Sequence, residues 1–194
     1  MGTRIGLLTP ALALAISSVG LGAAASGASA TTTLGGVQPP VNGGIGPPVV
    51  PSASGPEVTG TSAVVIRGLA YAPSRAPVKV KQVIWAANKI RHKPYKWGGG
   101  HGSWKDTGYD CSGSVSYALH GGGLLASPLD SRSFMKWGKA GAGRWITVFA
   151  TNGHAYMVVA GVRFDTSGAG QSGPRWRLER PWERRFKARH PAGL

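Results

Sequence analysis

Cysteine and acidic residues are scarce in this sequence. The chain of 194 residues contains one cysteine, Cys111, so it cannot form an internal disulfide. It has 7 Asp and Glu against 22 Lys and Arg, which gives a formal net charge of +15. Such an excess favours a polyanionic partner: nucleic acid, anionic lipid or an acidic cell wall. Charge alone does not select among these partners, whereas the compartment does.

Long hydrophobic runs are also missing, apart from an interrupted one near the N-terminus. Arg4 precedes a largely apolar stretch, 5–21, which falls short of the roughly 20 apolar residues that a membrane-spanning helix needs. Ala28-Ser29-Ala30 is a small-residue cleavage pattern. Together these features predict a signal peptide over residues 1–30 and a secreted protein, with a retained membrane anchor as the less favoured alternative. Nucleic acid is not the expected partner in that compartment.

Ahead of the region that carries most of the charge lie Pro39-Pro40, Pro47-Pro48, Pro51 and Pro56, among glycines. Residues 31–76 are interpreted as a Pro/Gly-rich flexible linker, in which 62–67 is either a short strand or part of the linker. A domain is predicted over residues 77–194.

The spacing of apolar residues predicts helices first and strands later in this domain. The expected helices are 78–91, a helix over 112–120 that opens at Asp110-Cys111, and a short one after Asp130 or Ser131. The expected strands of an antiparallel meander are 144–151, 154–160 and 162–166, and the basic tail 175–190 is expected to add a last strand.

Cys111 is the residue around which the chemistry is predicted. An unpaired thiol in an oxidising compartment is either a buried, inert side chain or a group that does chemistry. A thiol attacks a carbonyl as thiolate, a form that a helix N-terminus and a neighbouring imidazole both favour. Because Cys111 lies at the predicted start of a helix, we predict that it is a catalytic nucleophile.

The general base is sought among five histidines. His154 opens an apolar strand after a turn and is the favoured candidate, and His101 in a glycine-rich loop is the second. Asp165 lies on the next β-run and could orient the imidazole of His154 if the hairpin register allows it. The alternative is that Asp165 only begins a turn. A zinc site made of Cys111, His154 and His101 lacks clustered spacing, so no metal and no cofactor is expected.

Three motifs in order carry a family resemblance. Tyr95-x-Trp97-Gly98-Gly99, then Asp110-Cys111-Ser112-Gly113 opening a helix, then Gly153-His154 opening an apolar strand, resemble the NlpC-type family of bacterial cell-wall cysteine peptidases over about residues 78–190. The resemblance implies a papain-like α+β fold with a helix that starts at the catalytic cysteine and packs on an antiparallel sheet. It also implies hydrolysis of amide bonds in the stem peptides of peptidoglycan, usually between D-glutamate and a diamino acid.

The resemblance also assigns roles to single residues. The nucleophile of the family falls on Cys111, its base on His154, and its third polar residue, often a histidine, close to Asp165. The tyrosine beside the nucleophile falls on Tyr95, and the pocket-lining Asp and Ser that flank the cysteine fall on Asp110 and Ser112. This sequence departs from the family by a longer loop over 100–108, by Ser114 in place of a large apolar residue, and by Asp165 itself.

Two other functions fit the same residues. A non-catalytic module could bind anionic wall polymer through the cationic surface and the aromatic and basic tail. An amidase or acyltransferase could use the same Cys and His. In each case the expected partners are peptidoglycan and anionic wall polymers, and a cell-wall-associated monomer without stable membrane insertion is expected.

Overall fold

The computed structural model describes residues 54–168, 173–177 and 184–194. All of them belong to the second of two compact units, Ile45–Leu194. The predicted signal peptide and residues 31–53 of the predicted linker lie outside the described residues. In the part of the chain that is described, no helix is both long enough and apolar enough to cross a membrane.

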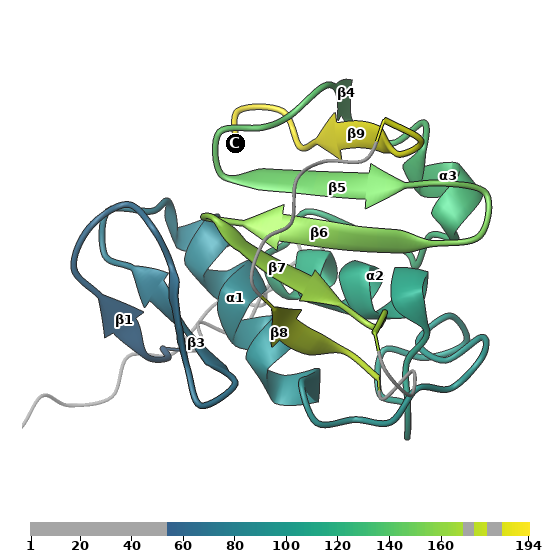
Figure 1. Cartoon of the computed structure of the whole chain (residues 1–194), viewed down its shortest axis with the longest axis horizontal. Coiled ribbons are helices and arrows are strands. Elements are labelled where there is room, and N and C mark those ends of the chain that lie inside the picture. Colours follow the sequence, from purple (N-terminus) through teal and green to yellow (C-terminus); the bar gives the residue numbers. More distant parts are fainter. Residues whose placement is uncertain (1–53, 169–172, 178–183) are drawn as a thin grey trace, which may run out of the picture. The chain divides into compact units, whose positions relative to one another are not determined.

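The main sheet has six strands in the order β4-β9-β5-β6-β7-β8, and every neighbouring pair is antiparallel. The predicted meander is confirmed as β5, β6 and β7. The basic tail supplies two strands rather than one, and β9 returns to pair with β5, as Figure 1 shows. The strands are β4 (Lys139–Ala140), β5 (Ile146–Ala150), β6 (Ala155–Val159), β7 (Val162–Asp165), β8 (Arg175–Arg177) and β9 (Lys187–His190).

Three helices accompany this sheet: α1 (Val78–Ile90), α2 (Cys111–Gly121) and the short α3 (Ser131–Phe134). The two longer helices agree with their predicted ranges to within a residue at each end. They pack closely against each other, since a Cβ added to Gly121 would lie 2.3 Å from the Cβ of Ala86. The other side of α2 packs on β6 and β7. The α+β class is therefore confirmed, with a helix that starts at Cys111 and packs on an antiparallel sheet.

A small second sheet precedes α1 and corrects the predicted domain boundary. Its strands β1 (Glu57–Val58), β2 (Val64–Ile66) and β3 (Leu69–Pro73) lie inside the range assigned to the linker. Ala70 and Ala72 are fully buried. The side chain of Asn88 in α1 pairs with both backbone groups of Ala70, at 2.8 and 3.0 Å, and accepts a hydrogen bond from the Trp176 indole at 2.8 Å. The folded part thus begins well before Pro77. The buried residues of this second sheet include small alanines, which give a weaker sequence signal than large apolar residues.

Candidate active site

Cys111 is the first residue of α2 and keeps 9% of its surface exposed. Asp110 precedes it as the N-cap, and its Oδ1 accepts a hydrogen bond from the backbone N–H of Gly113 at 2.7 Å. The free N–H groups of a first helical turn carry partial positive charge, which favours an anion at that end. Cys111 therefore lies at the end of α2 where free N–H groups are found, and it is buried except for a small part of its surface.

A glycine-rich loop approaches the start of this helix. The carbonyl oxygen of Gly99 accepts a hydrogen bond from the backbone N–H of Asp110 at 3.2 Å. A Cβ on Gly113 would lie only 2.0 Å from that oxygen. Because real Cβ atoms essentially never come so close, only glycine fits at position 113 while the loop stays in place. Gly113 in the Cys-Ser-Gly sequence is thus required for steric reasons, whereas Cys111 supplies the chemistry.

His154 follows the turn between β5 and β6 and faces Asp165. Its Nε2 lies 2.9 Å from Oδ1 of Asp165, and the His154 side chain is 26% exposed while the Asp165 side chain is fully buried. Cys111 lies near enough to His154 to raise the pKa of the imidazole. Since Asp165 engages Nε2, the nitrogen left for the sulfur is Nδ1. The fold therefore brings the three residues together in the order thiol, imidazole, carboxylate.

The register that brings Asp165 to His154 is set by a two-residue turn. Ala160 and Gly161 have φ values of 48° and 87°, and Val159 pairs with Val162. Positive φ at both central positions is typical of a tight type I′ hairpin turn. Counting from that pair, Asp165 stands opposite Tyr156, two residues from His154, which is a diagonal distance that side chains can bridge.

Burial and the two partners of His154 act on its proton affinity in opposite directions. Burial works to lower its pKa, but hydrogen bonds with Asp165 and Cys111, together with the charges of these groups, raise the pKa of His154 to about 9. Burial would likewise raise the pKa of Asp165, yet hydrogen bonds from His154 and Ser167 hold it well below its usual value. At neutral pH the favoured state therefore pairs an imidazolium with an ionised Asp165.

Tyr95 lies near enough to Cys111 and Asp110 to feel their charges. An isolated parallel β-bridge joins Tyr95 to Tyr109, the residue before the N-cap Asp110, and so holds the Tyr95 backbone near the start of α2. Partial burial, and then the nearby negative charges of Cys111 and Asp110, raise the pKa of Tyr95. Its hydroxyl therefore stays protonated and can donate a hydrogen bond.

His101, the second candidate for the base, is engaged elsewhere. Its Nε2 lies 3.0 Å from Oδ1 of Asp110 and 3.3 Å from Oγ of Ser112. The other oxygen of Asp110 accepts from the backbone N–H of Gly98 at 3.1 Å. His101 thus belongs with the residues that flank Cys111. Among the described residues, no group of three or more His, Cys, Asp or Glu is placed to hold a metal ion.

Contacts with residues on both sides of it hold the long 100–108 loop in place. Lys96 forms an ion pair with Asp106 at 2.7 Å, and the Tyr109 hydroxyl donates to the carbonyl of Trp104 at 2.6 Å. Trp104 stacks on His120, with ring centroids 4.0 Å apart. His120, at the end of α2 and on the far side of the helix from Cys111, therefore packs against the loop and is not the general base.

Arg163 and Ser167 were missed in the sequence analysis. Nε of Arg163 donates to Oδ2 of Asp165 at 2.8 Å, and Nη2 makes a second contact with the same oxygen. The hydroxyl of Ser167 donates to Oδ2 at 2.5 Å, and its backbone N–H donates to Oδ1 at 3.0 Å. The Arg-x-Asp spacing on β7 was the available signal for Arg163, because alternate residues of a strand share a face, whereas Ser167 lies beyond the end of β7.

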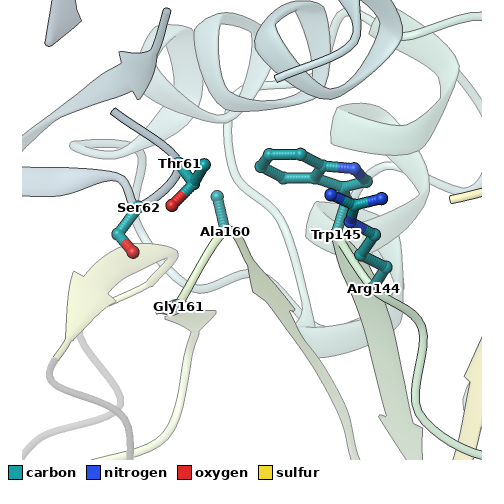
Figure 2. Close-up of a pocket in the computed structure, with 6 residues that line it drawn as sticks. All are labelled: Thr61, Ser62, Arg144, Trp145, Ala160 and Gly161. Atoms are coloured by element: carbon teal, nitrogen blue, oxygen red, sulfur yellow. The ribbon is translucent and has the colours of Figure 1, made fainter. Parts of the chain in front are cut away.

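A pocket of about 340 Å³ lies away from these residues, lined by Thr61, Ser62, Arg144, Trp145, Ala160 and Gly161 (Figure 2). Ala160 and Gly161 join β6 to β7, whereas His154 precedes β6 and Asp165 ends β7. The pocket and the Cys111 site therefore lie at opposite ends of the same two strands. Its lining offers no thiol, imidazole or carboxylate, so the chemistry belongs to the Cys111 site.

Comparison with known proteins gives structural neighbours only. No family model and no curated protein matches the chain. Among solved structures, the peptidoglycan hydrolase RipB from Mycobacterium tuberculosis is 24% identical with a TM-score of 0.47, and the match covers 60% of this chain and 69% of RipB.

Two further neighbours bear the name of the NlpC/P60 family that the motifs resemble. The P60 domain of an antigen from M. avium subspecies paratuberculosis is 23% identical with a TM-score of 0.44, over 57% of this chain and 93% of that domain. RipD from M. tuberculosis, described as a non-catalytic NlpC/p60 domain protein adapted to peptidoglycan binding, is 17% identical with a TM-score of 0.44, over 58% and 96%. Each is a protein to which this chain is similar, and the function below is argued from the chain's own residues.

Proposed function

We propose that this chain is a cysteine peptidase that hydrolyses amide bonds in the stem peptides of peptidoglycan. The observation that carries the proposal is the hydrogen bond between His154 and the buried Asp165, beside Cys111 at the N-terminus of α2. A thiol, an imidazole and a buried carboxylate in that order form the arrangement of a thiolate peptidase, which is recognised by geometry rather than by chain order.

The acylation step uses the ion pair that the site favours. The thiolate of Cys111 attacks the carbonyl carbon, a C–S bond forms, and the oxygen takes the negative charge. In this mechanism, free N–H groups of the first turn of α2 and the hydroxyl of Tyr95 donate to that oxyanion. Imidazolium His154 then gives its proton to the amide nitrogen, the C–N bond breaks, and the amine leaves.

Deacylation returns the site to its first state. Neutral His154 takes a proton from water as the water oxygen attacks the acyl carbon, and the C–S bond breaks to release a carboxylic acid and the thiolate. Throughout both steps Asp165 holds Nε2 of His154, so that Nδ1 stays directed at the reacting atoms. The carboxylate itself need not change its protonation state.

The substrate and the location follow from chemistry outside the triad. The net charge of +15 favours an anionic polymer, and the N-terminal pattern favours secretion to the cell wall. Together with the motif resemblance, this supports the bond between D-glutamate and a diamino acid as the scissile bond. We assign substrate binding next to Cys111 to Asp110 and Ser112, which are hydrogen-bonded to each other and to His101.

Mass spectrometry of products from purified peptidoglycan tests the function. The wild-type chain should release peptide fragments with new amine and carboxylate ends, and the Cys111→Ala variant should release none. The Ser127→Ala variant is the matched control, because it removes an exposed hydroxyl and leaves the thiol in place. Full activity in Cys111→Ala would refute the proposal.

A cationic wall-binding module is the second candidate, and the charge excess favours it. Co-sedimentation with purified wall separates the two functions. A binding module sediments with the wall and leaves its peptides intact, whereas a peptidase also trims them. Both the wild-type chain and Cys111→Ala should bind, since the basic residues are unchanged in the variant.

A further inference from the structure

Arg163 is bound to the far side of the Asp165 carboxylate. It stands two residues before Asp165 on β7, so the two side chains project from the same face of the strand. The guanidinium donates to Oδ2 of Asp165 through Nε at 2.8 Å and also through Nη2, while Oδ1 receives His154 at 2.9 Å. The two cationic partners therefore divide the two oxygens of one buried carboxylate between them.

The guanidinium is itself fixed by a third contact. It lies over the ring of Tyr156 on β6, with 3.8 Å between Cζ and the ring centroid, and its side chain is 11% exposed. Such stacking suits the planar guanidinium. A lysine cannot both donate two hydrogen bonds to the carboxylate and stack on the ring. Arg163 is thus a built element of the site and not a solvated surface charge.

Charged and aromatic groups from several elements surround His154. From α2 His154 meets the thiol of Cys111, and from β7 it meets Asp165 with Arg163 behind it. Its own strand contributes the ring of Tyr156, and Phe186 covers it from the segment before β9. On β8, Arg175 is the register partner of Asp165.

We propose that Arg163 is a positioning residue of the Cys111 site. It occupies Oδ2 of Asp165, leaves Oδ1 to His154 and the backbone N–H of Ser167, and offsets the carboxylate charge that His154 faces. The kinetic part of this inference rests on the proposed peptidase function, whereas its electrostatic part does not. If the guanidinium is removed, Asp165 keeps its contacts with His154 and Ser167. The carboxylate should therefore stay in place, but its full negative charge then acts on the imidazole.

The test is an NMR titration of the His154 ring in the full chain, carried out in the Cys111→Ala background so that the thiolate does not contribute. Arg163→Gln should move the titration of His154 to higher pH by about one unit, a tenfold gain in proton affinity. The exposed Arg75 is the matched control, since Arg75→Gln removes the same charge at the entrance to α1 and should leave the titration in place.

The Arg163→Lys variant separates the effect of the positive charge from that of the guanidinium geometry. It also provides a test if Arg163→Gln fails to fold. It should keep the titration near its wild-type position, because the charge is kept. With Cys111 intact it should lower turnover of peptidoglycan severalfold, because one ammonium cannot both donate the two hydrogen bonds and stack on the ring. A His154 titration that does not move in Arg163→Gln, or full turnover in Arg163→Lys, overturns the inference. Failure of the peptidase proposal itself would appear as an inactive wild-type chain, with the titration result unaffected.

Discussion

Nε2 of His154 and Oδ1 of Asp165 lie 2.9 Å apart across the β6–β7 hairpin, and the carboxylate is fully buried. A buried carboxylate held by its partner acts both as an orienter of the imidazole and as a source of negative charge. Both actions can be tested separately from the thiol.

Asp165→Asn should lower kcat by about 100-fold, a typical loss when acid–base catalysis is impaired. The amide lacks the charge that helps raise the pKa of His154 to about 9. That pKa should therefore fall, and the alkaline limb of the rate profile should move to lower pH. A pH–rate profile on a soluble stem peptide measures both effects, and an alkaline limb that stays in place would contradict the role given to Asp165.

Stability should depend on pH in a way that reflects the same pair. The pKa of His154 is higher in the folded chain, about 9, than its ordinary value of 6.5. Its contribution is thus fully present below about pH 6.5 and is lost as the pH rises through about 9. The free energy of unfolding should fall by about 3 kcal/mol over that window. Urea unfolding at several pH values measures the fall.

His154→Gln should flatten that dependence, whereas His92→Gln should leave it, because His92 is exposed beyond the end of α1. Asp165 contributes in the opposite range. Its pKa is lowered in the folded chain, so its contribution is present above its ordinary pKa and is lost as the pH falls through the folded value. A wild-type stability that is constant from neutral to alkaline pH would count against the ion pair.

Alkylation of Cys111 by iodoacetamide at neutral pH should be severalfold faster in the wild-type chain than in His154→Ala. Cys111 and the imidazole of His154 act on each other, and a neighbouring imidazole activates a thiol by taking its proton. Mass spectrometry of the labelled chain follows the reaction, and equal rates in the two chains would contradict an activated nucleophile.

Gly113→Ala should disturb the start of α2 for steric reasons alone. The added Cβ would lie 2.0 Å from the carbonyl oxygen of Gly99, and relief of such overlap costs about 1–3 kcal/mol of unfolding free energy. Gly102→Ala is the matched control, since nothing lies within 4 Å of its added Cβ. Thermal or urea unfolding measures the difference, and equal stability of the two variants would argue against the close approach of the loop.

Several elements of the fold could be predicted because their signals are local. The helix over 78–90 has an apolar stripe and a following proline, and the helix at Cys111 has Asp110 as a cap and glycines beyond its end. The strands of the meander are separated by Asn152-Gly153 and by Gly161. Short-range periodicity and turn chemistry carry this information, so it survives without any knowledge of distant contacts.

Other features gave no local signal. The strands of residues 57–73 are short and rich in small residues, and they are held by Asn88 and by burial against α1. Their composition resembles a linker because the stabilising partners lie far along the chain. The placement of β9 between β4 and β5 is of the same kind, since strand order depends on long-range pairing.

The sequence by itself determined which residues carry reactive groups, and it marked Cys111 and His154 by their positions at the starts of a helix and a strand. Tertiary structure alone decided that Asp165 reaches His154, that His101 is held by Asp110, and that Arg163 binds behind the carboxylate. The physical reason is that hydrogen bonds between side chains depend on register and packing across many residues, whereas helix starts and turns depend on neighbours along the chain.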